Sequence, residues 1–173
     1  LTQRDPRPHL IAMSATPIPR TLSLTVYGDL DITTLKILPK GRKPITTTLA
    51  NNNVKENAAY ELIRQQVAEG RQAFVVCPLI EPSEAVEAAS ALEEFDRLSN
   101  DEFKDLRVGL LHGRMKLTEK QEVMDKVRKR EIDVLVATPV IEVGVDIPNA
   151  TVMMIMSANR FGLAQLHQLR GRV

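Results

Sequence analysis

The sequence predicts an α/β fold of three layers, α/β/α, in which helices cover both faces of a mostly parallel β-sheet. Strand-like and helix-like segments alternate along most of the chain, and several strand-like segments are continuous apolar runs, as in strands buried on both faces. Polar and glycine-bearing segments follow these runs. Because crossover connections bring the carboxyl ends of parallel strands to one edge, we expect a binding site at that edge.

Local signals delimit the expected elements. A Ser, Thr or Asn followed three residues later by Glu or Gln is typical of a helix start, and glycine of a helix end. Such pairs occur at Asn53 with Glu56 and at Thr118 with Gln121. Residues 28–44 carry prolines and a glycine without a clear period, which indicates a connector. We expect strands at 9–14, 45–50, 73–77, 107–113, 132–137 and 151–156, and helices after 19 and over 53–70, 83–95, 118–130 and 162–170.

The composition restricts the class of protein. The 173 residues carry a net charge of +1, so any basic binding surface has to be local. No apolar run approaches the roughly 20 residues of a membrane span, and we see no secretory signal, so we expect no contact with a membrane. Cys77 is the only cysteine, which excludes an internal disulfide and favours the cytoplasm. Aromatic residues make up 3%, which argues against binding by several stacked bases.

The segment after strand 132–137 carries groups that suit a nucleotide or a phosphate. The hydroxyl of Thr138 and nearby backbone N–H groups suit a phosphate oxygen. Gly144 permits a close approach of the backbone to a ligand, and Asp146 is a possible acceptor for a ribose hydroxyl. Taken alone, the segment is explained better as a strand-to-helix turn capped by Asp146.

Two other strand ends carry similar groups. His112, Gly113 and Arg114 offer donors and an open backbone for a phosphodiester, although a turn with two exposed polar side chains explains them equally well. Ser14 and Thr16 place two hydroxyls after strand 9–14, which also fits a capped turn.

Two arginines lie close together in the final segment of the sequence. Arg170 and Arg172 flank Gly171, which we expect to break the last helix and free at least one side chain to reach a phosphate held elsewhere. A basic helix end that complements the macrodipole is the simpler explanation of these residues alone. The sequence contains no G-x-x-x-x-G-K-[ST] loop for ATP phosphates and no G-x-G-x-x-G turn for a dinucleotide.

In this order and spacing, the segments SATP, FVVCPLIE, LHGRM, VLVATPVIEVGVDIP and QLHQLRGRV resemble the motor core of superfamily 2 helicases, from the third conserved motif to the sixth. MSATPIPRTLSLTVYGDLD, CPLIEPSE and FGLAQLHQLRGRV are similar to the RecG family of bacterial branch-migration helicases. The resemblance covers nearly all of the chain. It implies RecA-like domains that close on ATP, and an ATP-dependent helicase that remodels branched DNA in repair and recombination.

The resemblance also implies partners and residue roles. ATP and Mg²⁺ would be bound mainly by a first motor domain, and the full-length enzyme would act on branched or duplex DNA as a cytoplasmic monomer. The implied sites are catalytic Arg172 and Gln168, nucleotide-binding Gly144, Asp146 and Arg170, DNA-binding His112, Gly113, Arg114 and Thr138, and coupling Ser14 and Thr16, with no metal ligand.

The implied domain organisation has three parts. Residues 1–26 would end a first RecA-like domain, 27–44 would be a connector, and 45–173 would form a second RecA-like domain that stops within the sixth motif. We expect no ATP hydrolysis by this segment alone. Two alternatives stay open: a transcription-repair coupling translocase of the same superfamily, and a non-catalytic nucleic-acid binding module.

Overall fold

The computed structural model describes residues 33, 44–78, 84–139 and 147–173, so its description concerns the compact unit Lys43–Val173. The strand expected at 9–14 and the helix after it lie outside the described residues. So do all but two positions of the connector.

Four parallel strands form the sheet, in the order β2-β3-β1-β4. They are β1 (Gln72–Val76), β2 (Val108–Leu111), β3 (Val134–Ala137) and β4 (Ala150–Ile155). The central strands β1 and β3 are buried along their whole length, as their continuous apolar runs predict. The predicted parallel α/β sheet is therefore confirmed.

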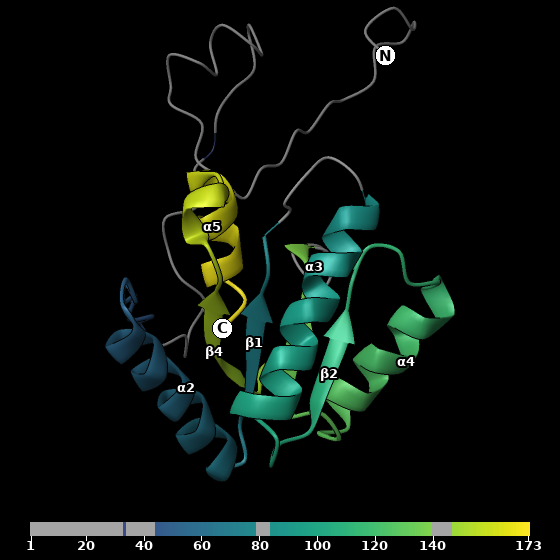
Figure 1. Ribbon diagram of the computed structural model, residues 1–173, viewed down its shortest axis with the longest axis horizontal. Coiled ribbons are helices and arrows are strands. Elements are labelled where there is room, and N and C mark those ends of the chain that lie inside the picture. The colour runs from purple at the N-terminus through teal and green to yellow at the C-terminus, as the bar shows by residue number, and fades with distance from the viewer. Residues whose placement is uncertain (1–32, 34–43, 79–83, 140–146) are drawn as a thin grey trace, which may run out of the picture. The chain divides into compact units, whose positions relative to one another are not determined.

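Helices cover both faces of this sheet (Figure 1). The longer helices are α2 (Asn53–Ala68), α3 (Glu84–Arg97), α4 (Leu117–Arg128) and α5 (Leu163–Arg170), with short helical turns η1 (Leu98–Glu102) and η3 (Ala158–Arg160). None of the helices within the described ranges is both long and apolar enough to cross a membrane.

Alternate strand residues supply two separate cores. On one face, Val75 and Val136 pack with Tyr60 and Ile63 of α2. On the other face, strand residues that include Phe74 pack with residues of α4 and α5. This alternation is the two-residue period of a strand, and it makes the fold a three-layer α/β/α sandwich.

Polar contacts fix the amino-terminal edge of the sheet. The buried Gln72 side chain donates to the carbonyls of Val127 and Ile132 at 2.8 and 2.7 Å, and its Oε1 accepts from Asn149 at 3.1 Å. These contacts join the start of β1 to the end of α4, the start of β3 and the turn before β4. The side chains at the opposite edge of the sheet, where the strands end, take no part in these contacts.

An ion pair holds the starts of β2 and β3 together. Arg107 donates to both carboxylate oxygens of Asp133, at 3.0 and 2.6 Å, and its backbone N–H donates to the same carboxylate at 2.9 Å. Burial opposes the ionisation of Asp133, but the hydrogen bonds from Arg107 outweigh it and lower the pKa of the carboxyl group.

Three local expectations are wrong. The N-cap of α2 is Asn52 rather than Asn53, because the side chain of Asn52 accepts the backbone N–H of Lys55 at 3.0 Å. Helix α4 begins at Leu117, with Glu119 accepting from the backbone of Lys116 at 2.7 Å, in place of the expected Thr118–Gln121 pair. Residues 45–50 are exposed and form no strand, because their β-branched side chains have no partner strand in the described part of the sheet.

Helices α2 and α4 end in the same backbone geometry with different residues. In α2 the amides of Gly70 and Arg71 bond back to Val67 and Gln66, and in α4 the amides of Arg130 and Glu131 bond back to Val127 and Lys126. The residue in the left-handed position is Gly70 in α2, at φ 79°, and Arg130 in α4, at φ 59°. Only glycine adopts this conformation without steric cost.

This difference predicts opposite effects of two substitutions. Arg130→Gly should raise the free energy of unfolding by about 0.5–1 kcal/mol, because it relieves the left-handed strain. Gly70→Ala should lower it by about 1 kcal/mol, since nothing lies within 4 Å of an added Cβ and strain alone acts. Urea denaturation measures both values. Destabilisation by both substitutions would contradict the strain at Arg130.

Cys77 predicts a loss of stability in alkali. Burial raises the pKa of its thiol from about 9 to about 12, with a smaller contribution from Glu94. The unfolded chain therefore ionises this thiol first, so its contribution is complete below pH 9 and is lost as the pH rises towards 12. The loss should reach about 1.4 kcal/mol at pH 10. Denaturation between pH 8 and 10 should show a shallower decline for Cys77→Ala, and an equal slope would refute this assignment.

Candidate functional site

The carboxyl ends of the four strands form one row at a single edge of the sheet. Three backbone hydrogen bonds extend the ladders past the strands: Thr138 N–H to Leu111 O at 3.1 Å, Cys77 N–H to Ala137 O at 2.8 Å, and Met156 N–H to Val76 O at 2.9 Å. The residues that follow β2, β3, β1 and β4 are therefore neighbours, in that order. Figure 1 shows α5 at this end of the sheet.

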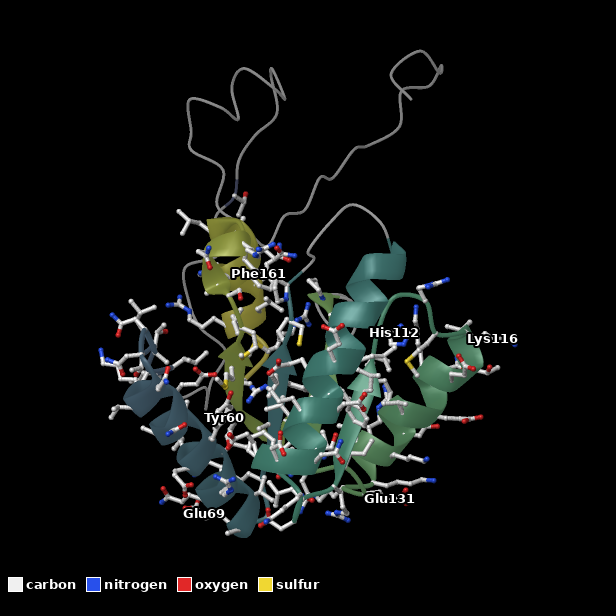
Figure 2. All side chains as sticks on the ribbon, viewed as in Figure 1. Tyr60, Glu69, His112, Lys116, Glu131 and Phe161 are labelled. Atoms are coloured by element: carbon white, nitrogen blue, oxygen red, sulfur yellow. The ribbon has the colours of Figure 1, made fainter. Side chains whose placement is uncertain are left out.

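The turn between β2 and α4 contains the first group of predicted site residues. His112 is partly buried, and its backbone N–H donates to the Met115 sulfur at 3.4 Å. Arg114 is exposed and forms no ion pair with any residue that the structure describes. Lys120 reaches back from α4 and donates to the carbonyl of Gly113 at 2.6 Å. Figure 2 shows His112 towards the carboxyl edge, with Glu69 and Glu131 at the opposite end.

Thr138 lies beside this turn. Thr138 is fully buried, and its hydroxyl has no hydrogen-bond partner within the described ranges. A buried hydroxyl left without a partner costs about 1–3 kcal/mol, so a water, a ligand or a group outside these ranges is expected to satisfy it. The structure thus brings Thr138 and His112 together, as the sequence predicts for strand ends of neighbouring strands.

The second group of predicted residues lies on α5. Leu169 is completely buried, and Leu166 and Val173 pack against the same core. The intervening Arg170 is exposed, with its guanidinium 3.3 Å from the Nδ1 of His167, and Arg172 is partly buried. The core contacts of Leu169 therefore fix where the helix presents its cationic end.

Gly171 ends α5 as predicted, but without a sharp reversal. It is the C-cap residue, at φ −72° and ψ 0°, and its N–H bonds to the carbonyls of His167 and Gln168. The backbone of Arg172 also turns back, to the carbonyl of Leu169 at 2.9 Å. The two arginines consequently follow one tightening helical turn rather than a left-handed kink.

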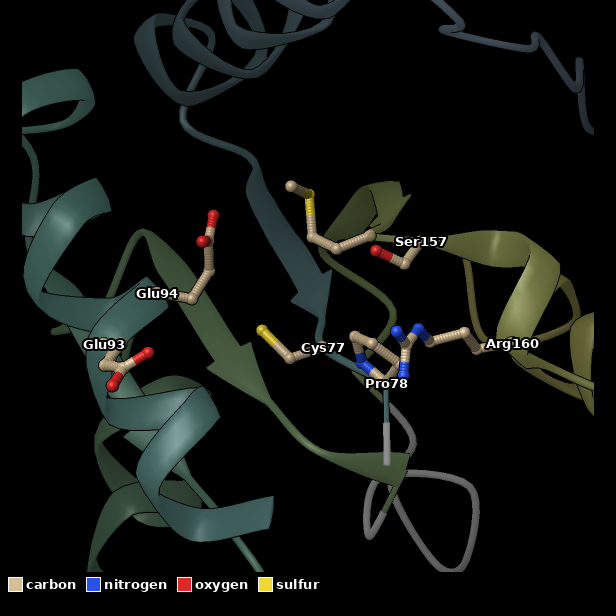
Figure 3. Close-up of a pocket in the computed structure, with 7 residues that line it drawn as sticks. Cys77, Pro78, Glu93, Glu94, Ser157 and Arg160 are labelled. Carbon is tan, nitrogen blue, oxygen red and sulfur yellow. The ribbon is translucent and has the colours of Figure 1, made fainter. Parts of the chain in front are cut away.

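A hollow of about 210 Å³ lies between α3 and the end of β4. Figure 3 shows Glu93 and Glu94 of α3 on one side of it, Arg160 of η3 on the other, and Cys77 between them. Ser157 adopts a left-handed conformation, φ 47°, as the chain leaves β4. The volume is below the roughly 300 Å³ at which small-molecule sites begin, so this hollow alone does not hold a nucleotide.

Several predicted residues lie outside the described residues, namely Gly144, Asp146, Ser14 and Thr16. Sequence reasoning missed Lys120, Ser157 and Arg160. Helical spacing does not link Lys120 to Gly113, because Gly113 lies in the turn before α4, and the left-handed Ser157 has no sequence signal either. No three His, Cys, Asp or Glu side chains within the described ranges gather to hold a metal ion.

Two proteins similar to this chain carry the same name. The chain is 50% identical over 166 residues to the ATP-dependent DNA helicase RecG of Synechocystis sp., covering 96% of the chain and 20% of that protein. It is 47% identical over 174 residues to the protein of the same name from Staphylococcus epidermidis, covering 100% of the chain and 25% of that protein. The chain therefore spans a fifth to a quarter of the length of these relatives.

Among solved structures, the helicase domain of Pyrococcus furiosus Hef is similar to this chain at 21% identity and a TM-score of 0.47. The alignment covers 68% of this chain and 22% of the Hef chain. Residues 54–173 match the model of the helicase conserved C-terminal domain. Because this match covers well over half of the chain, the chain belongs to the helicase conserved C-terminal domain family, which has the RecA-like α/β fold.

Proposed function

We propose that the protein carrying this chain is an ATP-dependent DNA helicase that remodels branched DNA, such as stalled forks and Holliday junctions. One observation carries the proposal: relatives named ATP-dependent DNA helicase RecG align with 96–100% of the chain at 47–50% identity. Their name favours this function over a transcription-repair coupling translocase and over a non-catalytic binding module.

In this proposal the described unit is the second of two RecA-like motor domains. Residues 45–173 form it, 27–44 connect it, and 1–26 complete the first motor domain. ATP binds between the two domains, which close on it, and this closure moves the protein along DNA. Ser14 and Thr16 couple the state of the nucleotide to the grip on DNA.

The end of α5 supplies the nucleotide-facing groups of this domain. The exposed Arg170 contacts the nucleotide, and Arg172 stabilises the negative charge that develops on the γ-phosphate. Gln168 lies one turn before Arg172 and helps to orient the reacting groups. Gly144 and Asp146 complete the contact on the ribose side. The cationic end of α5 fits a polyphosphate, since guanidinium groups bind phosphate oxygens in pairs.

The β2–α4 turn and the end of β3 supply the DNA-binding groups. His112, Gly113 and Arg114 contact a backbone phosphate, and the unsatisfied hydroxyl of Thr138 beside them fits a phosphate oxygen. Phosphate contacts fix position without reading sequence, which suits a motor that acts on any sequence.

The remaining parts of the proposal concern the whole protein. ATP and Mg²⁺ are held mainly by the first motor domain, as the resemblance to superfamily 2 helicases implies. The enzyme acts as a monomer in the cytoplasm, where Cys77, the buried and single cysteine of this chain, stays reduced.

The first test measures ATP hydrolysis by the full-length protein on a synthetic four-way junction. The wild-type protein should hydrolyse ATP faster with the junction and separate its strands. Arg172→Ala should lower the DNA-stimulated rate by roughly 10³–10⁵-fold, because it removes charge stabilisation at the γ-phosphate, while DNA affinity stays within about twofold. Unchanged turnover would refute the role of Arg172, and a wild-type protein inert on every DNA tested would refute the function.

The second test concerns Arg114. In the full-length protein, Arg114→Ala should weaken DNA binding about fivefold to tenfold at 0.1 M salt, because one phosphate contact is lost. The plot of log affinity against log salt concentration should become shallower by about one. Arg128→Ala, at the opposite end of α4, is the matched control and should change neither quantity. Equal effects of the two substitutions would contradict a DNA contact at the β2–α4 turn.

A further inference from the structure

Lys120 has a position that the stability of α4 does not explain. It is the fourth residue of the helix, where a positive charge opposes the helix macrodipole. The nearest carboxylate in sequence, Glu119, already accepts the backbone N–H of Lys116 at 2.7 Å. None of the ion pairs formed among the described residues includes Lys120.

The side chain is nevertheless held in one place. Its Nζ donates to the carbonyl oxygen of Gly113 at 2.6 Å, and the residue is partly buried against the turn. An ammonium group has three donors, and this bond uses one of them. Two N–H donors and a full positive charge therefore remain beside the backbone of His112, Gly113 and Arg114.

The surroundings favour an anion at this point. Arg114 and Lys116 are exposed in the same turn, and the first amides of α4 add partial positive charge. The unsatisfied hydroxyl of Thr138 lies next along the edge, through the bond from its N–H to Leu111. A phosphate offers several acceptor oxygens and the negative charge that these groups lack.

We propose that Lys120 is a DNA-binding residue, which contacts a backbone phosphate directly while its bond to Gly113 holds the β2–α4 turn in place. The inference rests on the proposed DNA-binding function and assigns to this surface a cation that lies outside the turn itself. The bond to Gly113 orders the lysine before DNA arrives, so less side-chain freedom is lost on binding.

The test uses the full-length protein and a fluorescent DNA duplex, titrated between 50 and 200 mM salt. Lys120→Met keeps the length of the side chain and removes its charge, so affinity at 0.1 M salt should fall about fivefold to tenfold, and the salt slope by about one. Lys120→Arg keeps a cation at the turn and should retain the wild-type slope. Lys126→Met, in the last turn of the same helix, is the matched control and should alter neither value.

Each outcome has a defined consequence. A wild-type salt slope for Lys120→Met overturns the direct contact, even if the affinity falls, because a turn that is only loosened loses affinity without losing a phosphate charge. Loss of slope in Lys120→Arg equal to that in Lys120→Met also overturns it. If Lys120→Met keeps the slope while Arg114→Ala lowers it, the inference fails and the proposed function stands. If Arg114→Ala keeps the slope as well, the proposed interface itself fails.

Discussion

The parallel register of the sheet is the constraint on which the site depends. A shift by one residue would turn every buried strand side chain to the opposite face and would separate the groups at the carboxyl ends. The register is secured at the far edge, where Gln72 joins α4, β3 and the turn before β4, and where Asp133 binds Arg107. Polar contacts at one edge thus help to determine which residues become neighbours at the other.

The carboxyl edge divides into regions of different charge. Around the ends of β2 and β3 lie the cations Arg114 and Lys120, and the carboxylate of Glu119 there accepts the backbone N–H of Lys116. Beside β1 and β4 the hollow combines carboxylates of α3 with Arg160. A polyanion gains most where cations outnumber carboxylates, which favours the proposed DNA contact at the β2–α4 turn over one at the hollow, where Glu93 and Glu94 face Arg160.

Apolar patterning made the sheet and α5 predictable, because continuous apolar runs and helical periodicity report burial directly. Helix starts were missed by a residue or two, since three consecutive asparagines compete as the cap of α2 and the backbone of Lys116 finds Glu119 first. The segment 45–50 has the residue types of a strand but no partner, which sequence alone does not reveal. That the site residues meet at one edge was predictable from the parallel crossovers, whereas the conformation of Ser157 depends on how the chain leaves β4.

The end of α5 and the β2–α4 turn both carry arginine, but different contacts hold them in place. This difference fits their proposed functions. Leu169 is buried in the core between the sheet and α5, and Val173 packs against the same core, so the position of Arg172 between them follows the body of the domain. The β2–α4 turn is held by single contacts, from Lys120 to Gly113 and from His112 to Met115. A charge that has to meet a γ-phosphate on another domain needs the first kind of support, because an error of an ångström is costly in catalysis. A turn that binds and releases successive DNA phosphates needs only the weaker support of single contacts.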